Sequence, residues 1–266
     1  MFNKAIKKNL LYGGILLAVI ALVFFFILKP APAEDSEKID VTIAQESKIV
    51  TDGEYIFFNN PEGDVMFMHA FDTTATPWGP DWNVVAAGET HMLFEKDGAW
   101  AIFNKEEKGI EETYDIKTDN AQFNDEALFY KDKKTNNIMM IDRKTKEEST
   151  IVPYGVNEFV VSGNEIVYVP EGKKTGIVIY DYKSGMVSIF AQDRTAKGIN
   201  YIENQLIFSD ADKKGQVFNI NKSASIETKI ENVKTTNFCF SKGIYFYTKK
   251  SKGEYKLVFN NKDEYR

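Results

Sequence analysis

The chain has 266 residues, of which 43% are hydrophobic and 27% are charged, and its formal net charge is −6 at pH 7. This balance is typical of a folded protein and excludes disorder over most of the length. The acidic charge disfavours nucleic acid or an anionic lipid surface as the main partner. A single cysteine, Cys239, excludes an intramolecular disulfide, and we expect it to be a small apolar strand residue.

The first element is an uncharged apolar run from Leu10 to Leu28. As a helix of 1.5 Å per residue it would be about 28 Å long, which matches the hydrocarbon core of a bilayer. Three lysines precede the run, whereas acidic residues follow it soon after Lys29. The positive-inside rule therefore predicts a transmembrane helix over residues 10–28, a short cytoplasmic N-terminus over residues 1–9, and an extracytoplasmic remainder.

A cleaved signal peptide is the alternative, because Ala31-Pro32-Ala33 has the form of a cleavage site after Ala33. The apolar run is longer than the usual signal-peptide core and Lys29 follows it directly, so we favour a retained anchor in the cell membrane. Residues 29–38 contain two prolines and three acids, which is typical of an extended linker.

The rest of the chain is organised as a repeat, and residues 157–191 hold its clearest copy: four short β-branched and aromatic runs separated by turn residues. The second run of each copy is aliphatic or Met at its first position and aromatic at its third. The aromatic positions follow one another at intervals of about 36 to 40 residues, the range of repeat architectures. The copies are Ile56–Phe58, Met92–Phe94, Leu128–Tyr130, Ile166–Tyr168, Leu206–Phe208 and Ile244–Phe246.

A third run follows each copy and in most copies is closed by Asn or Asp, which we interpret as backbone-bonding turn residues. The sixth copy has too few residues left for a fourth strand. The segment Ile39–Ile43 alternates apolar and polar residues and could supply that strand, closing a ring. The sequence therefore predicts an all-β, six-bladed β-propeller of four-stranded antiparallel blades over residues 39–266, preceded by one N-terminal transmembrane α-helix.

Units such as Leu206–Asp210 followed by Gly215–Ile220, and Tyr55–Asn60 followed by Val65–Met68, resemble bacterial relatives of the six-bladed YWTD propellers of lipoprotein-receptor type. The resemblance covers nearly all of the extracytoplasmic part and implies the same ring of six blades. The Tyr-Trp-Thr-Asp tetrad itself is absent, and only Phe208-Ser209-Asp210 approximates its end. No binding residue of that family is carried over to this chain.

The loop from Thr73 to Trp82 interrupts the repeat and holds two of the three tryptophans. Exposed indole rings on a rigid loop could anchor a protein partner or stack on a sugar. We therefore take Trp78, Asp81 and Trp82 as candidate ligand- or partner-binding residues. The alternative is that both tryptophans fold back and plug the ring, because buried indole is the commoner outcome.

Other chemistry is weakly supported. The two histidines, His69 and His91, have too few ligands near them in sequence for a zinc site. The segment from Asp210 to Gly215 begins like a calcium loop but departs from it at later ligand positions, so we interpret it as a hairpin loop. We expect no metal, no cofactor and no catalytic residue, and hence no enzyme.

Two functions remain open. The first is a membrane-tethered scaffold that binds another protein of the cell envelope through one rim of the ring. The second is a propeller that binds or processes cell-surface glycan with Trp78 and Trp82. Exposure of these tryptophans around a concave pocket would favour the second function.

Overall fold

The computed structural model describes residues 41–45, 47–79 and 81–261. The predicted membrane helix over residues 10–28 and the linker over residues 29–38 lie outside these residues, as do Ile39 and Asp40 of the predicted closing strand. Within the described residues, no helix has both the length and the apolar character that a membrane span requires.

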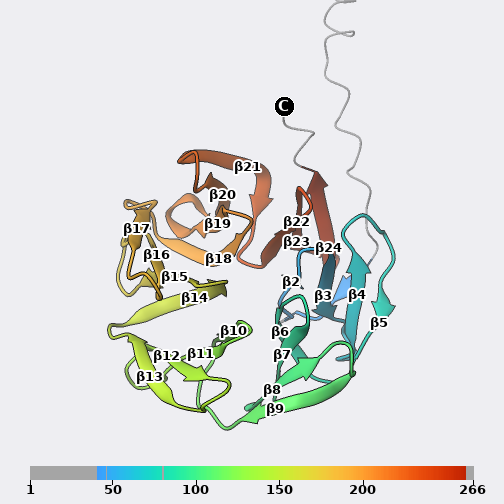
Figure 1. Cartoon of the computed structure of the whole chain (residues 1–266). Coiled ribbons are helices and arrows are strands. Elements are labelled where there is room, and N and C mark those ends of the chain that lie inside the picture. The colour runs from blue at the N-terminus through green and yellow to red at the C-terminus, as the bar shows by residue number, and fades with distance from the viewer. Residues whose placement is uncertain (1–40, 46, 80, 262–266) are drawn as a thin grey trace, which may run out of the picture. The chain divides into compact units, whose positions relative to one another are not determined.

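The described residues from Val41 onward form six antiparallel sheets of four strands each, which are the six blades of a β-propeller (Figure 1). The first three blades follow the chain order. Their strands are β2 (Val50–Thr51), β3 (Tyr55–Asn59), β4 (Val65–His69) and β5 (Thr76–Pro77); β6 (Asn83–Ala87), β7 (His91–Lys96), β8 (Ala99–Asn104) and β9 (Gly109–Tyr114); and β10 (Ala121–Phe123), β11 (Ala127–Lys131), β12 (Ile138–Asp142) and β13 (Glu148–Val152).

The other three blades complete the ring. Their strands are β14 (Val156–Ser162), β15 (Glu165–Pro170), β16 (Ile177–Asp181) and β17 (Val187–Phe190); β18 (Ala196–Ile202), β19 (Gln205–Asp210), β20 (Gln216–Asn221) and β21 (Ile226–Lys234); and β22 (Phe238–Ser241), β23 (Ile244–Ser251) and β24 (Glu254–Asn261) with β1 (Thr42–Ile43). One short 3₁₀ helix, Ala211–Lys213, joins β19 to β20.

The last blade takes its outer strand from the other end of the sequence, which is the pairing that the sequence predicts. Thr42 lies opposite Lys256 and Ile43 lies opposite Tyr255, and the backbone N–H of Leu257 donates to the carbonyl of Val41 at 3.0 Å. The innermost strands β2, β6, β10, β14, β18 and β22 each contact both of their neighbours around the ring. The propeller is thereby closed, and no blade is left with an open face.

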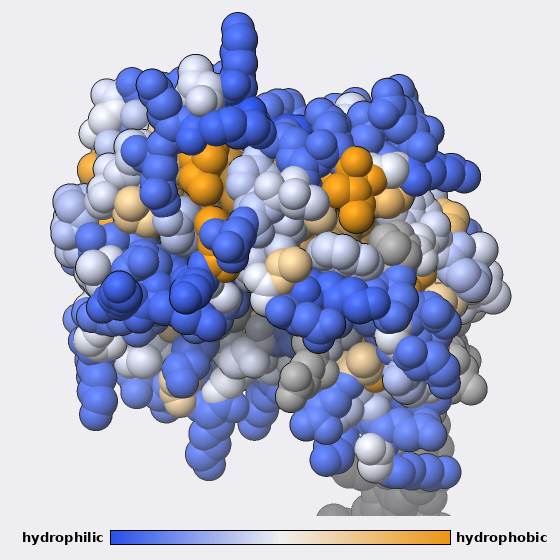
Figure 2. Space-filling view, turned by 90° about the horizontal axis from the view of Figure 1, so that it is seen from below, coloured by the Kyte–Doolittle hydropathy of each residue, from blue (hydrophilic) through white to orange (hydrophobic). Residues whose placement is uncertain are grey.

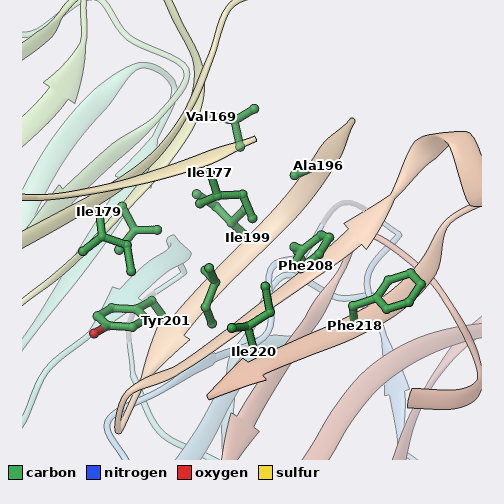
Figure 3. Close-up of a cluster of buried hydrophobic side chains, with 11 residues drawn as sticks. Val169, Ile177, Ile179, Ala196, Ile199, Tyr201, Phe208, Phe218 and Ile220 are labelled. Carbon is green, nitrogen blue, oxygen red and sulfur yellow. The ribbon is translucent and has the colours of Figure 1, made fainter. Parts of the chain in front are cut away.

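The hydrophobic core is divided into six layers, one between each pair of adjacent blades. The repeated aromatic residues of the second strands are all buried in these layers. Figure 3 shows the layer between the fourth and fifth blades, where Val169, Ile177 and Ile179 of one sheet face Ile199 and Phe208 of the next. Stacking neighbours in this way buries the apolar face that a single four-stranded sheet would leave in water.

The turns confirm the interpretation of the recurrent Asn and Asp residues. The Asp142 carboxylate accepts from the backbone N–H groups of Lys144 at 2.9 Å and Thr145 at 2.7 Å, and Asp181 accepts in the same way from Lys183 and Ser184. These bonds hold the pKa of both carboxyl groups below the usual range. The side chains therefore stabilise hairpins between third and fourth strands.

Candidate functional site

The loop that carries the predicted site residues is held against the ring by the short strand β5. Thr76 and Pro77 pair with Phe67 and Met66, and the backbone N–H of Trp78 donates to the carbonyl of Val65 at 2.8 Å. The indole of Trp78 then lies between the first two blades, with ring centres 5.8 Å from Phe57 and 5.3 Å from Phe103. Trp78 is half-buried in the layer between those blades and does not line the central channel.

Asp81 and Trp82 are placed differently from Trp78. Trp82 is also half-buried against the layer between the first two blades, and its carbonyl accepts from Asn59 Nδ2 at 2.7 Å. The Asp81 carboxylate is largely exposed and pairs with Lys96 Nζ at 3.0 Å. The three predicted residues therefore do not converge on one pocket: Trp78 lines a cavity that neither Asp81 nor Trp82 reaches.

The cavity beside Trp78 has a volume of about 310 Å³ and combines aromatic walls with acidic groups. Lys105 Nζ lies 2.5 Å from an oxygen of Asp52 and 5.0 Å from the ring centre of Phe57. The Lys105 ammonium group therefore already pairs with one acid and one aromatic ring of the cavity wall. The lining residues are Asp52, Glu54, Tyr55, Phe57, Phe67, Trp78, Glu89 and Lys105.

The two histidines take part in local polar contacts. His91 Nε2 lies 2.7 Å from Glu111 Oε2, and this contact lowers the pKa of the Glu111 carboxyl. His69 Nε2 lies 4.0 Å from Glu54 Oε1. Within the described residues, no three His, Cys, Asp or Glu side chains are grouped so that they could hold a metal ion.

The segment that begins like a calcium loop is a hairpin connection. The Asp210 side chain is only 1% exposed, accepts from the backbone N–H of Asp212 at 3.0 Å and pairs with Arg194 Nη1 at 2.8 Å. An oxygen of Asp212 accepts from the hydroxyl of Thr195 at 2.8 Å. The segment therefore connects the paired strands β19 and β20, as the hairpin interpretation expects.

The central channel is a site that the sequence interpretation missed. Its bore has a volume of about 230 Å³ and is lined by residues from the inner strands of all six blades. Polar side chains at its wall include Lys48, Asn120, Glu158, Asn200 and Asn237. Glu158 and Asn200 lie on the first strands of their copies, and the other three lie one or two residues before such strands. An alignment of these segments, in addition to the second strands, could have drawn attention to them.

Two ionisable groups in the channel have shifted pKa values. Burial raises the pKa of the Glu158 carboxyl to about 7, although the backbone N–H groups of Gly198 and Ile199 and the charge of Lys48 partly offset this effect. Protein atoms around the Lys48 ammonium lower its pKa, against the charges of Glu158 and Asp119. Lys48 nevertheless exposes much of its surface, so water in the channel screens this effect.

An apolar edge on the fourth blade is a further candidate site. The outer strand β17 and the residue before it expose Met186 (69%), Val187 (58%) and Ile189 (51%). Among the outer strands longer than two residues in the described part of the chain, β17 alone carries no charged side chain. The face seen in Figure 2 is mostly hydrophilic, with apolar side chains reaching the surface in small separate patches. An apolar edge strand in such a surface is a common place for another chain to pair.

The fold and these sites define the protein as a six-bladed β-propeller with an open central channel. No protein-family model matches the chain, and no curated protein matches it. Solved structures are similar in fold. TolB from Acinetobacter baumannii has a TM-score of 0.62 at 10% identity, over 80% of this chain and 62% of the TolB chain.

Two other similar structures come from protein assemblies. PorZ, a surface component of the type-IX secretion system of Porphyromonas gingivalis, has a TM-score of 0.52 at 10% identity, over 84% of this chain and 32% of its own. A chain of the nidogen/laminin complex has a TM-score of 0.50 at 11% identity, over 68% of this chain and 77% of its own. This chain thus spans about a third of PorZ, and identities this low establish a shared fold only.

Proposed function

We propose that this protein is a membrane-tethered, extracytoplasmic β-propeller that binds a partner protein of a cell-envelope assembly through the outer edge of its fourth blade. The observation that carries the proposal is the charge-free, exposed edge strand β17. The apolar run from Leu10 to Leu28 supports the tether. PorZ and the similar chain of the nidogen/laminin complex both belong to protein assemblies, which is consistent with a binding role for the fold.

The geometry of β17 favours a partner segment of extended conformation. Val187 and Ile189 point to the same face of the blade, opposite Tyr180 and Val178 of β16, while the other edge of β17 has no partner strand within the described residues. A strand added there would gain backbone hydrogen bonds along the edge, and its own alternate side chains would meet Val187 and Ile189. The partner we propose therefore carries an extended segment with apolar residues at every second position.

The test is capture of the partner from intact cells by photo-reactive groups at Val187 and, as a matched control, at Ser149 on β13, the outer strand of the third blade. We expect a discrete protein adduct from Val187 only. The double substitution Val187→Lys with Ile189→Lys should abolish the adduct, while Ser149→Lys leaves it unchanged. These side chains are exposed, so stability should change by less than about 0.5 kcal/mol. Equal capture from both strands would contradict the proposal.

The tether has its own test. Membrane fractions should retain the full chain after alkaline extraction, and added protease should digest the propeller of intact cells or spheroplasts while the membrane remains sealed. A chain that is released from the membrane by alkali, or one that begins after Ala33, would contradict the retained anchor and leave the binding edge to be judged separately.

A second candidate function is glycan binding at the cavity beside Trp78. The aromatic residues Trp78 and Tyr55 line this cavity and could stack on a sugar ring. Three acidic residues also line it and could bond to the hydroxyl groups of the sugar: Asp52, Glu54 and Glu89. Trp78→Ala should then weaken binding of purified surface glycan, whereas Trp82→Phe should leave it unchanged. Recovery of glycan at Trp78 and of no protein at β17 would favour this function over the first.

A further inference from the structure

The connections between the second and third strands of the six blades all lie on the same rim of the propeller, because the strands of each blade are antiparallel. In blades three to six this rim carries nine exposed lysines, which we call the basic sector. Blades three, four and five each contribute an adjacent pair: Lys133 and Lys134, Lys173 and Lys174, and Lys213 and Lys214. The sixth blade contributes Lys249, Lys250 and Lys252, from the end of β23 and the turn after it.

The basic sector lacks counter-charges within the described part of the protein. None of its nine lysines forms an ion pair with a described residue. The acids in and beside the same connections are bonded to other groups: Asp132 accepts from the backbone N–H of Thr135 at 2.8 Å, and Glu171 accepts from Asn136 Nδ2 at 2.6 Å. The remaining acids are bonded to Arg194, Thr195 and Lys256, and they are Asp210, Asp212 and Glu254, respectively.

Cations on the opposite rim are used differently. There, a cation in the connection between the third and fourth strands pairs with an acid of the preceding blade. The pairs are Lys105 with Asp52, Arg143 with Glu112, Lys183 with Glu126 and Lys222 with Glu165. These pairs join neighbouring blades, which accounts for the cations of that rim. Among the described residues, no such contact accounts for the lysines of the basic sector, so we looked for a ligand that would need them.

The distribution of charge on this rim favours a linear ligand over a flat one. The connections of the first two blades carry exposed acids instead of lysine pairs, namely Glu62, Asp64 and Asp97. A planar anionic membrane would meet all six connections, and these acids would be repelled by it. The four basic connections also hold no exposed large apolar side chain that could insert into a bilayer. A linear polymer can follow blades three to six and avoid the acids.

We infer that the basic sector binds a linear polyanion that carries repeated phosphate groups along its length. Lysine binds phosphate as a point charge and needs no fixed geometry, so regularly spaced lysines suit a flexible polymer. Each contact is weak alone, but many contacts to one polymer add up. The net charge of −6 is a sum over the whole chain and does not describe this sector. That the polyanion is an envelope polymer rests on the proposed extracytoplasmic location, whereas binding itself does not.

The probe is long-chain inorganic polyphosphate, added to the full chain in nanodiscs of neutral lipid. Labelled polyphosphate should bind at low salt, and its affinity should fall about threefold for each lysine engaged as the salt rises from about 50 to 200 mM. Inorganic phosphate at the same total phosphate concentration should not displace it. Absence of binding, or displacement by inorganic phosphate as effective as by free polyphosphate, would overturn the inference and leave the protein-binding edge to its own test.

Matched double variants locate the site. Lys173→Gln with Lys174→Gln, and Lys213→Gln with Lys214→Gln, should each lower the affinity about tenfold at low salt. The control is Lys108→Gln with Lys144→Gln, which removes the same charge from exposed lysines of the opposite rim and should change the affinity by less than about twofold. Melting temperatures should be alike in all three variants, because the side chains are exposed. Equal losses in sector and control variants would show that only overall charge matters.

A competition experiment separates the polymer from a lipid surface. Phosphatidylglycerol vesicles, at the same total phosphate concentration, should displace labelled polyphosphate far less than free polyphosphate does. Displacement as effective as that by free polyphosphate would mean that the rim binds an anionic membrane, and would overturn the inference of a linear ligand.

Discussion

Asn237 of the last blade is bonded through both atoms of its side-chain amide to the segment around Ser47 that enters the first blade. Its Oδ1 atom accepts from the backbone N–H of Ile49 at 3.2 Å, and its Nδ2 atom donates to the carbonyl of Ser47 at 2.7 Å. Residues nearly the whole propeller apart in sequence are thereby joined beside the channel. We call these two bonds the seam. They join the first and last blades, which no hairpin connects, and so help to hold the ring closed.

Asn237→Ala should destabilise the propeller, because it removes two hydrogen bonds and leaves partly buried backbone groups of Ser47 and Ile49 without partners. The expected loss is about 1–3 kcal/mol in the free energy of unfolding. Denaturant unfolding measures it, with Thr236→Ala as the neighbouring, exposed control. A variant that unfolds at the same denaturant concentration as the parent would show that the seam adds nothing to closure.

Ile43→Ala tests the closing strand itself. Ile43 is 1% exposed and packs in the layer between the first and last blades. Truncating a buried aliphatic side chain costs about 2–5 kcal/mol. For a domain of this size each kcal/mol corresponds to about 2–4 °C in melting temperature. Deletion of Ile39–Ile43 should cost more, because the outer strand of a blade is then lost. A truncated chain that melts at the parental temperature would contradict closure by this strand.

Gly198 and Gly163 offer a matched pair for the geometry of the channel wall. Their φ angles are +57° and +56°, but a Cβ at Gly163 meets no atom within 4 Å, whereas one at Gly198 meets the backbone of Thr236. Gly163→Ala should therefore cost only the left-handed backbone penalty, about 1–2 kcal/mol. Gly198→Ala should cost clearly more, because backbone atoms of another blade must move. Equal losses in the two variants would show that the close approach is easily relieved.

The raised pKa of the Glu158 carboxyl predicts how the stability of the protein depends on pH. Its pKa is raised from 4.5 to about 7 in the folded protein, so between these values the folded state holds a proton that the unfolded chain has lost. Stability contributed by this group is present below about pH 4.5 and falls as the pH rises toward 7. The loss is at most about 3 kcal/mol and is reduced by water in the channel.

The measurement is the free energy of unfolding across this pH range for the parent and for Glu158→Gln. The charged groups that act on Glu158 are Lys48 and Lys197, with Asp119 acting on Lys48 in turn. Other groups titrate in both proteins, so the difference between the two proteins isolates Glu158. That difference should shift in favour of the Gln variant as the pH rises. A constant difference would mean that the carboxyl has an ordinary pKa.

The sites were harder to predict from sequence than the blades. Trp78 and Trp82 are close in sequence, yet only Trp78 lines a cavity, because β5 pairs with just two residues of β4 and the loop then turns along the blade boundary. That Trp78 and Trp82 bind a ligand or a partner stays a prediction. The exposed strand β17 was recognisable as a strand from its composition, but its exposure depends on its position at the edge of a sheet.

By itself, the sequence determined the repeat: the aliphatic and aromatic pattern of each second strand specified the number of blades, and the leftover segment before the first copy specified how the ring closes. These are local patterns, and local propensity and burial periodicity are encoded residue by residue. Only the tertiary structure decided which side chains share a space. Lys48, Glu158 and Asn200 line one channel because six blades form a closed circle, and no spacing along the chain records which strands lie across that circle from one another.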